Sequence, residues 1–288
     1  MKEKIIIFGA SKRGEYVYKK VHEEKNVIYF CDNDEKKWGK RICGIEIISP
    51  KELFRHDCKI IIASIYSDDI KKQLSYMGLN NIYVYPSAIE CLLKSIKDKE
   101  ENIEEMHCLS VFGGKGCINE KFLQDYVKKI EIWEICKEFE SELRNNVPKA
   151  EVKIVDSFEQ LNKTIQKYDM VFMDNPMSIY EDHCENFDMF MQHFKVLKDE
   201  AIIILDIITR LDNIPKEFNY IRNDMHLLCR KLFFRTTNPE NISIDIIKKT
   251  YQSIIERGGF KVEWDLVEER TDDFIYYLAF KIKKINDR

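Results

Sequence analysis

The chain has 288 residues, of which 44% are hydrophobic and 33% charged, a composition typical of one large or two ordinary globular domains. The formal net charge of −4 gives no overall attraction to nucleic acid or anionic membranes, and no apolar stretch approaches the roughly 20 residues of a membrane helix. The N-terminus enters an apolar strand directly and lacks the features of a secretory signal peptide, so we expect a cytoplasmic protein.

The cysteines agree with that compartment. There are nine, scattered singly, and none forms a C-x-x-C pair. Free thiols explain this pattern better than disulfides or zinc. The histidines show no metal-ligand spacing either, because His183 and His193 are not at i, i+4, so we expect no metal site.

Residues 1–93 alternate apolar runs with amphipathic stretches, which is the pattern of a parallel α/β sheet. Ser49 followed by Pro50 indicates a helix start, with serine as N-cap and proline in the first turn. The predicted strands are 4–8, 27–31, 59–63 and 82–85, and the predicted helices are about 12–24, 50–55 and 67–77.

The first strand leads into a glycine turn. Gly9, Ser11 and Gly14 give the pattern G-x-S-x-x-G, and Asp32 ends the next apolar run. This spacing suits a strand–turn–helix–strand unit that binds phosphate at the helix N-terminus and ribose or sugar hydroxyls on the acid. Serine in place of the middle glycine hinders close approach of a pyrophosphate, but its hydroxyl can donate to a phosphate.

Residues 94–105 are nearly all charged and predict an exposed linker. Residues 106–288 repeat the alternation with more elements, interrupted by an irregular segment at 208–240 and closed by an antiparallel hairpin. The predicted strands are 108–112, 129–134, 151–155, 169–173, 200–207, 260–268 and 274–283, and the predicted helices lie near 118–127, 136–145, 157–167, 183–196 and 242–257.

A second glycine turn follows the first of these strands. It contains Gly113, Gly114 and Gly116, and Glu134 ends the next strand about 20 residues later. One such turn is weak evidence, but two turns, each with its acid, predict two tandem Rossmann-like domains with mainly parallel sheets.

The order of elements in 106–284 resembles that of class I S-adenosylmethionine (SAM)-dependent methyltransferases. The segment 112–116, Phe-Gly-Gly-Lys-Gly, occupies the place of that family's G-x-G-x-G and is similar to the G-G-G-D-G of spermidine synthases. The resemblance implies that Gly113, Gly114 and Gly116 approach the methionine part of SAM, that Glu134 binds the ribose hydroxyls, and that Asp156 meets the adenine amine.

Two positions depart from that family. Phe112 replaces the first glycine, and Ser110 replaces an acid two residues earlier. Phe112 either narrows the cofactor pocket or packs under the turn. Asp156 before Ser157 is equally explained as the N-cap of the following helix.

Two residues after the fourth strand are candidates for catalysis. Asp174 lies where the resemblance places acceptor-binding or catalytic residues, and His183 follows closely and titrates near neutrality. Asp174 is also explained as a turn former, and His183 as a polar residue in the first turn of a helix. Basic residues in 208–240 suit a cover over an anionic acceptor, or else a solvated face; they are Arg210, Arg222, Arg230, Lys231 and Arg235.

Residues 4–85 resemble the N-terminal domains of bacterial sugar N-acyltransferases and related polysaccharide-biosynthesis enzymes. The matching segments include Ile-Phe-Gly-Ala-Ser-Lys-Arg-Gly at 7–14, Phe-Cys-Asp-Asn-Asp at 30–34 and Ile-Ile-Ile-Ala-Ser at 60–64. The resemblance implies that this domain holds a UDP-sugar or, as in other families, NAD. The alternative is a vestigial domain that serves assembly.

These observations lead to one hypothesis and its alternatives. The hypothesis is SAM-dependent methyl transfer to a sugar, sugar nucleotide or related surface-glycan precursor, with a small-molecule acceptor and no nucleic-acid or membrane partner. The alternatives are a non-catalytic binding or assembly protein with a degenerate cofactor fold, and an NAD-dependent or aminopropyl-transfer enzyme, since fold alone does not give function. The oligomeric state stays open, a homo-oligomer included.

Overall fold

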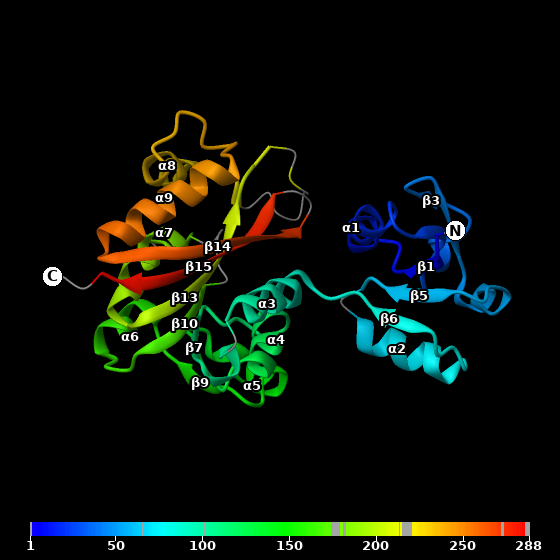
Figure 1. Cartoon of the computed structure of the whole chain (residues 1–288), viewed down its shortest axis with the longest axis horizontal. Coiled ribbons are helices and arrows are strands. Elements are labelled where there is room, and N and C mark those ends of the chain that lie inside the picture. The colour runs from blue at the N-terminus through cyan, green and yellow to red at the C-terminus, as the bar shows by residue number, and fades with distance from the viewer. Residues whose placement is uncertain are drawn as a thin grey trace. The chain divides into compact units, whose positions relative to one another are not determined.

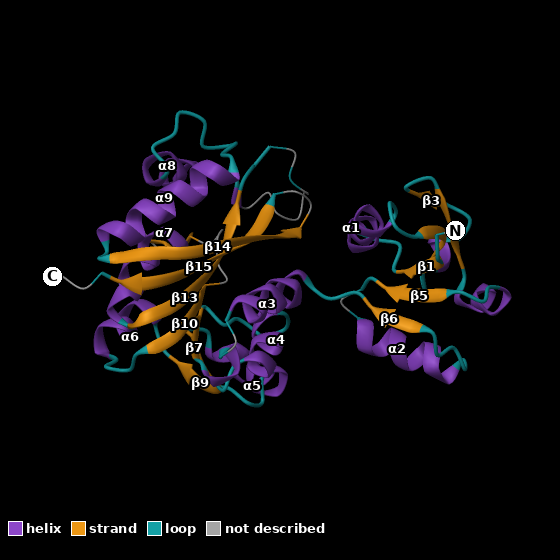
Figure 2. Ribbon diagram, viewed as in Figure 1, coloured by secondary structure: helices purple, strands orange, loops and turns teal. Residues whose placement is uncertain are grey.

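The computed structural model describes residues 2–64, 66–100, 102–173, 179–180, 183–212, 214, 221–271 and 274–285. The chain divides into two compact units, unit 1 at Met1–Ser87 and unit 2 at Ala88–Arg288 (Figure 1). Each unit combines helices with a mostly parallel sheet, so the prediction of an α/β protein with mainly parallel sheets is confirmed (Figure 2). Within the described ranges, no helix has the length and apolar character needed to cross a membrane.

Unit 1 is built on a six-stranded sheet in the order β3-β4-β2-β1-β5-β6, in which only the β3–β4 pair is antiparallel. Its strands are β1 (Lys4–Phe8), β2 (Asn26–Cys31), β3 (Arg41–Ile42), β4 (Ile45–Ile48), β5 (Lys59–Ile62) and β6 (Ile82–Val84). Its helices are α1 (Lys12–Val21) and α2 (Ser67–Tyr76), with 3-10 helices at Glu35–Lys37 and Pro50–Arg55.

The strands of unit 1 are buried on both faces, which explains their continuous apolar runs. In β1, Ile5 and Ile7 contribute to the core on one face, while Ile6 and Phe8 contribute to the core on the other. The predicted helix start at Ser49 is confirmed, because Ser49 and Glu52 form a reciprocal capping box.

Unit 2 is built on a seven-stranded sheet in the order β14-β15-β13-β10-β7-β8-β9, with only β15 running antiparallel to its neighbours. The strands are β7 (His107–Val111), β8 (Lys129–Glu134), β9 (Glu151–Ile154), β10 (Tyr168–Met173), β13 (Leu197–Ile208), β14 (Phe260–Thr271) and β15 (Ile275–Lys284), and a separate small pair is β11 (Ile179–Tyr180) and β12 (His183–Cys184).

The helices of unit 2 cover both faces of this sheet (Figure 1). One core lies on the side of α3 (Ala88–Lys99), α4 (Asn119–Tyr126) and α5 (Glu140–Asn146). The other lies on the side of α6 (Ser157–Lys163), α7 (Glu185–Phe190) and α9 (Ile244–Arg257), and α8 (Asp224–Phe233) lies beside α9. Short 3-10 helices occupy Ile103–Glu105, Lys137–Phe139 and Met191–Lys195.

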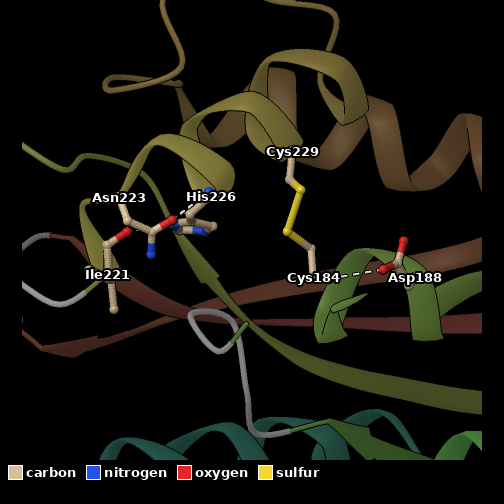
Figure 3. Close-up of a disulfide and its surroundings, with 6 residues drawn as sticks. All are labelled: Cys184, Asp188, Ile221, Asn223, His226 and Cys229. Atoms are coloured by element: carbon tan, nitrogen blue, oxygen red, sulfur yellow. Dashed lines mark hydrogen bonds between the residues drawn. A yellow bond between two sulfur atoms is a disulfide. The ribbon is translucent and has the colours of Figure 1, made fainter. Parts of the chain in front are cut away.

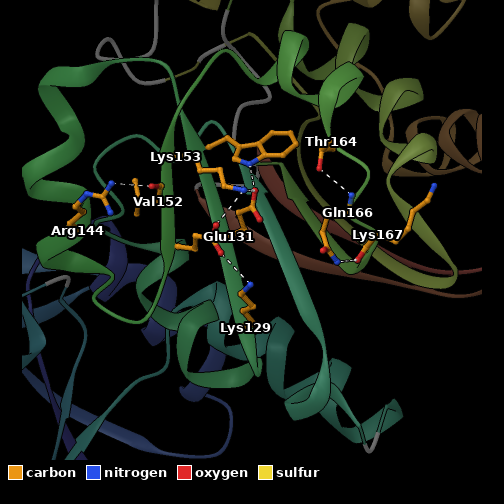
Figure 4. Close-up of polar contacts among 10 residues, drawn as sticks. Lys129, Glu131, Arg144, Val152, Lys153, Thr164, Gln166 and Lys167 are labelled. Atoms are coloured by element: carbon orange, nitrogen blue, oxygen red, sulfur yellow. Dashed lines mark hydrogen bonds and ion pairs between the residues drawn. The ribbon is translucent and has the colours of Figure 1, made fainter.

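Polar contacts fix the β8–β9 edge of this sheet. The buried Glu131 carboxylate accepts hydrogen bonds from the Trp133 indole at 2.5 Å and the Lys153 ammonium at 2.7 Å (Figure 4). Because Glu131 lies on β8 and Lys153 on β9, their contact ties together the strand that ends at Glu134 and the strand that precedes Asp156.

Three expectations about the chain need correction. The segment 94–105 is no exposed linker, because it lies in α3 and the 3-10 helix after it, and Ile96 and Ile103 are fully buried in unit 2. The irregular segment 208–240 contains the helix α8. Of the nine cysteines expected as free thiols, Cys184 and Cys229 form a disulfide between the start of α7 and α8 (Figure 3), and the other seven are free.

Candidate functional site

Both sheets reverse their strand order next to the strand that enters a glycine turn. In unit 2, β8 and β9 lie on one side of β7, while β10 and β13 lie on the other. Ligands of open α/β sheets bind in the crevice outside the carboxyl ends of the strands at such a reversal. The turn after β7 and the ends of β8, β9 and β13 therefore outline the candidate site of unit 2.

The three glycines of this turn are required for different reasons. A Cβ on Gly113 would lie 2.2 Å from the Ile132 side chain, and one on Gly116 would lie 2.6 Å from Leu143, so both positions need glycine for packing. Gly114 has a φ of +53°, and no atom lies within 4 Å of a Cβ built there. Gly114 is thus the glycine of this turn that close packing does not require, and its Cα faces open space.

Phe112 occupies a left-handed conformation, with a φ of +61°. Glycine is favoured there because a side chain in this region costs about 1–2 kcal/mol. The phenyl ring packs against the α6–α9 core and lies 6.2 Å, centre to centre, from the ring of Phe158. Of the two readings that the sequence left open, the structure supports packing under the turn.

Glu134 connects the glycine turn to the end of β8. Its side chain is buried, and its carboxylate accepts the Gly114 backbone N–H at 2.6 Å and the Cys136 backbone N–H at 2.7 Å. A carboxylate has about four lone-pair sites, so these two bonds leave room for two more donors, such as a pair of hydroxyls. The sequence named Glu134, but its contact with the turn could not be seen from spacing.

Asp156 serves as the N-cap of α6 and uses only one of its carboxylate oxygens to do so. Its Oδ1 accepts the backbone N–H groups of Phe158 at 2.8 Å and Glu159 at 3.1 Å, which confirms the N-cap reading for α6. Its half-buried carboxylate has no further hydrogen bond among the described residues, so Oδ2 can accept a ligand amine. The Val155 N–H donates to the Glu134 carbonyl at 2.9 Å and holds the two strand ends together.

The charges around this turn are mostly negative. Glu120, in the first turn of α4, is buried and accepts the Ser110 hydroxyl at 3.0 Å. The nearest cation in sequence, Lys115, pairs with Glu142 at 3.0 Å. A carboxylate at the N-terminus of α4 repels a pyrophosphate but suits a cation or a set of hydroxyls. Sequence reasoning missed Glu120, because it took the replacement of an acid by Ser110 as a loss.

A cysteine, Cys136, lies two residues after Glu134 at this site. Burial raises the pKa of Cys136, and the adjacent Glu134 carboxylate raises that pKa further. The reactive form is the thiolate, so Cys136 stays protonated near neutral pH. Among the described side chains, no group of three His, Cys, Asp or Glu residues is arranged to hold a metal ion.

The two predicted catalytic residues are only partly covered by the structure. Asp174 lies outside the described residues. His183 is described only in its backbone, in β12. Their catalytic roles therefore stay predictions.

Unit 1 has a pocket of about 610 Å³ at its own strand-order reversal. Gly9 and Gly14 are needed for packing, since a Cβ on them would lie 2.4 Å from the Ala63 carbonyl and 1.9 Å from the Gly9 carbonyl respectively. Ser11 caps α1 without a side-chain cap bond, so its exposed hydroxyl can face a ligand. The pocket is lined by Phe8, Gly9, Ser11, Arg13, Asp32, Asn33, Lys37, Ser64, Tyr66, Asp69, Ile70 and Gln73.

Asp32 is heavily engaged in this pocket. It accepts the Ala10 N–H at 2.8 Å, the Asp34 N–H at 2.9 Å and the Lys37 ammonium at 2.9 Å. Its first task is therefore to brace the turn, with less capacity left for ligand hydroxyls than the sequence suggested. Lys37, which sequence reasoning did not single out, brings a cation to the pocket beside Arg13.

Two of the basic residues of segment 208–240 have structural partners. Arg230 is fully buried and donates to the backbone carbonyls of Ile208 at 2.9 Å and Pro239 at 2.6 Å, and burial lowers its pKa to about 10. Arg222 pairs with Glu240 at 2.7 Å. Arg230 thus braces the cover from inside and does not face an anionic acceptor.

Comparison with known proteins gives a family match for unit 1 only. The family described as C2185-like, N-terminal, matches residues 1–84. No curated protein matches the sequence of this chain.

Solved structures similar to this chain include several methyltransferases. A putative RNA methyltransferase from Pyrococcus horikoshii is 16% identical, with a TM-score of 0.43 over 69% of this chain and 85% of that one. Magnesium protoporphyrin IX methyltransferase from Synechocystis PCC 6803 with bound SAH is 12% identical, with a TM-score of 0.44 over 67% and 80%. TYW2 from M. jannaschii in complex with AdoMet is 13% identical, with a TM-score of 0.42 over 70% and 78%. All three TM-scores lie below 0.5, so the function has to be inferred from the residues of the site.

Proposed function

We propose that unit 2 is a SAM-dependent methyltransferase that acts on a hydroxyl or amino group of a small acceptor. The observation that carries this proposal is the buried Glu134 carboxylate bound to the N–H of Gly114, the one glycine of the turn with an open side. A turn braced by a carboxylate, with Glu120 at the next helix, favours a ligand that is cationic and rich in hydroxyls over a pyrophosphate.

The residues of the site fit SAM in three places. Gly114 offers an open backbone for the methionine part, Glu134 has capacity for two ribose hydroxyls, and Asp156 Oδ2 suits the adenine amine. When bound, SAM would supply a methyl group activated by a sulfonium, for direct in-line transfer to the acceptor. The protein's own task is then to orient the acceptor and remove its proton, which we assign to Asp174 or His183.

For the acceptor, we propose a sugar, sugar nucleotide or related surface-glycan precursor. Unit 1 supports this class, because its pocket has the free Ser11 hydroxyl and the cation Arg13 at the start of a helix, groups that suit a phosphate. Unit 1 would hold or sense a nucleotide-linked sugar such as a UDP-sugar. NAD is the second ligand to test there, because the same turn pattern is found in dinucleotide-binding domains.

Calorimetric titration of the whole chain with SAM, its demethylated product S-adenosylhomocysteine (SAH), UDP and NAD tests these assignments. We expect SAH to bind and Glu134→Ala to weaken it at least about 100-fold, since charge-assisted hydrogen bonds are lost. The matched control is Glu138→Ala, an exposed acid four residues further on, which should change the SAH affinity less than about twofold.

Each outcome distinguishes one hypothesis. Failure of SAM and SAH to bind a folded chain contradicts the methyltransferase proposal and favours a binding or assembly protein. Binding of NAD but not SAH would point to an oxidoreductase, and preference for decarboxylated SAM would point to aminopropyl transfer. Binding of UDP that survives Glu134→Ala would locate the nucleotide in unit 1.

A further inference from the structure

A buried acid lies at the carboxyl end of the parallel strands β7, β10 and β13, one residue past their last paired positions. Val111 on β7 pairs with Met173 on β10, which pairs with Leu205 on β13, and Asp206 comes next. Its register partner on β15 is Tyr277. Asp206 therefore lies at the carboxyl edge of β13, beside the crevice that holds the proposed cofactor site.

Contacts connect this acid to the helix that follows the glycine turn. Asp206 forms an ion pair through Oδ2 with Arg270 of β14. The Arg270 guanidinium lies 5.4 Å from the centre of the Tyr277 ring, and the Tyr277 hydroxyl donates to Asn119 at 2.5 Å. Asn119 is the first residue of α4, so one line of polar contacts joins Asp206 to the proposed cofactor site.

The second oxygen of this carboxylate has no hydrogen bond. Asp206 is fully buried, and Oδ1 is without a hydrogen-bond partner among the residues that the structure describes. A buried polar atom left in this state costs about 1–3 kcal/mol. Oδ1 belongs to a carboxylate whose other oxygen is held by a guanidinium, so it offers lone pairs only and requires a donor.

The fold alone does not call for an acid at this position. The preceding residues of β13 that point to the same side, Ile202 and Ile204, are fully buried and apolar. Replacing such a residue by an ion pair incurs a desolvation penalty that the attraction between the charges often fails to offset. An unsatisfied acid in this row is therefore better explained by a ligand than by stability.

We propose that Asp206 Oδ1 accepts a hydrogen bond from a hydroxyl or amino group of the acceptor that lies next to the group receiving the methyl, and so orients the acceptor in the crevice. This inference rests on the proposed function of unit 2. It defines the acceptor by chemistry, as a molecule that carries an O–H or N–H donor beside the reacting atom. Arg270 acts as a positioning residue, because it fixes the carboxylate through the other oxygen.

The test compares Asp206→Asn and Asp206→Glu with the whole wild-type chain. Asp206→Glu keeps the charge that pairs with Arg270 but moves the oxygens by one methylene, so it isolates position from charge. Asp169→Asn is the matched control, because Asp169 lies at the opposite end of β10 and pairs with Lys198 at 2.8 Å. Methyl transfer from SAM is measured with UDP-N-acetylglucosamine, UDP-glucose, glucosamine and glucose, alongside the Kd of SAH.

We expect both Asp206 variants to bind SAH within about twofold of wild type and to lose about 10- to 100-fold in kcat, the range expected for a hydrogen bond to a charged group. Asp169→Asn should transfer methyl at the wild-type rate. Unchanged kcat in Asp206→Glu and Asp206→Asn would overturn the inference, as would SAH binding without transfer to any of these acceptors. Failure of the wild-type chain to bind SAH is a different result, which contradicts the proposed function instead.

Discussion

The turn after β1 and the turn after β7 follow the same strand–turn–helix plan, but different charges face them. In unit 1 the helix begins with an exposed serine hydroxyl, and the pocket is lined by two cations, Arg13 and Lys37, and two acids, Asp32 and Asp69. In unit 2 the turn is held by the Glu134 carboxylate, and Glu120 is buried in the first turn of the helix. The shared glycines establish the turn, while the charges around it differ, since they are of both signs in unit 1 and mostly negative in unit 2.

The glycines themselves also differ between the two turns. Gly9 and Gly14 of unit 1 are both needed for close approach of backbone to backbone. In unit 2 only Gly113 and Gly116 are needed for packing, while Gly114 faces open space. Thus packing requires glycine at four of these five positions but not at Gly114.

Acidification should destabilise unit 2 more than unit 1, and this is the largest effect that we expect. Burial lowers the pKa of His193 in unit 2 from 6.5 to about 3, although the Met189 carbonyl favours the protonated form. Between pH 6.5 and 3 the unfolded chain binds a proton that the folded chain does not. The free energy of unfolding of unit 2 is therefore highest above pH 6.5 and decreases as the pH is lowered below that value. The loss reaches about 4 kcal/mol near pH 3.5, since each pKa unit is worth 1.36 kcal/mol.

Hydrogen exchange measured peptide by peptide at pH 7, 5 and 4 checks this prediction, because it reports both units in one chain. We expect the protection of unit 2, measured relative to the intrinsic exchange rate at each pH, to fall with pH more than that of unit 1, and His193→Leu should remove most of this pH dependence. His22→Asn is the control, because His22 of unit 1 is exposed. Equal acid sensitivity in wild type and His193→Leu would show that other groups control the response.

A substitution at Gly14 should unfold unit 1 selectively. In Gly14→Ala the new Cβ would lie 1.9 Å from the Gly9 carbonyl, and neither backbone can move without losing the turn. We expect a loss of about 3 kcal/mol in unit 1, the upper end for overpacking. Denaturant unfolding measures the loss, and SAH titration of the same variant should show unit 2 unaffected.

The control in unit 1 is Gly78→Ala, where φ is +77° and no atom lies within 4 Å of the new Cβ. It should cost only the strain of the left-handed conformation, about 1 kcal/mol. If Gly14→Ala and Gly78→Ala cost the same, close approach is not what requires glycine at position 14.

The sequence predicted most elements because buried parallel strands have continuous apolar runs. It missed the β3–β4 hairpin, whose strands are only two and four residues long, and it missed α8 between two prolines. The candidate site was predictable where a motif keeps its residues close in sequence, as at Gly113, Gly114 and Gly116. Glu134 and Asp156 were predictable as well, because each lies at or just after the end of an apolar run that the sequence marks as a strand.

What the sequence could not give is the set of contacts between distant segments. The pair of Asp206 and Arg270 joins residues 64 apart, and the disulfide of Cys184 and Cys229 joins residues 45 apart. Neither pair has a local pattern, since each depends on the register of strands or on helix packing. Glu120 was missed for a related reason, because its role depends on contact with Ser110 ten residues earlier.

Gly114→Ala should have the smallest effect on folding. It also tests directly whether the two glycine turns differ in their relation to a ligand. The left-handed φ of +53° makes alanine cost about 1 kcal/mol in stability, and no neighbouring atom adds to this cost. If the open side of Gly114 faces the cofactor, the added methyl should still weaken SAH binding about tenfold, because it occupies the ligand's space. Calorimetry gives the Kd, and a melting curve gives the stability.

Gly116→Ala provides the opposite pattern for comparison. Its Cβ would lie 2.6 Å from Leu143 and 2.7 Å from Val147, so it should cost more stability than Gly114→Ala while pointing into the protein. A Gly114→Ala variant that binds SAH as tightly as wild type would mean that the open side is not the ligand side. The two turns would then differ only in the charges around them, and SAM binding would be supported by Glu134 rather than by Gly114.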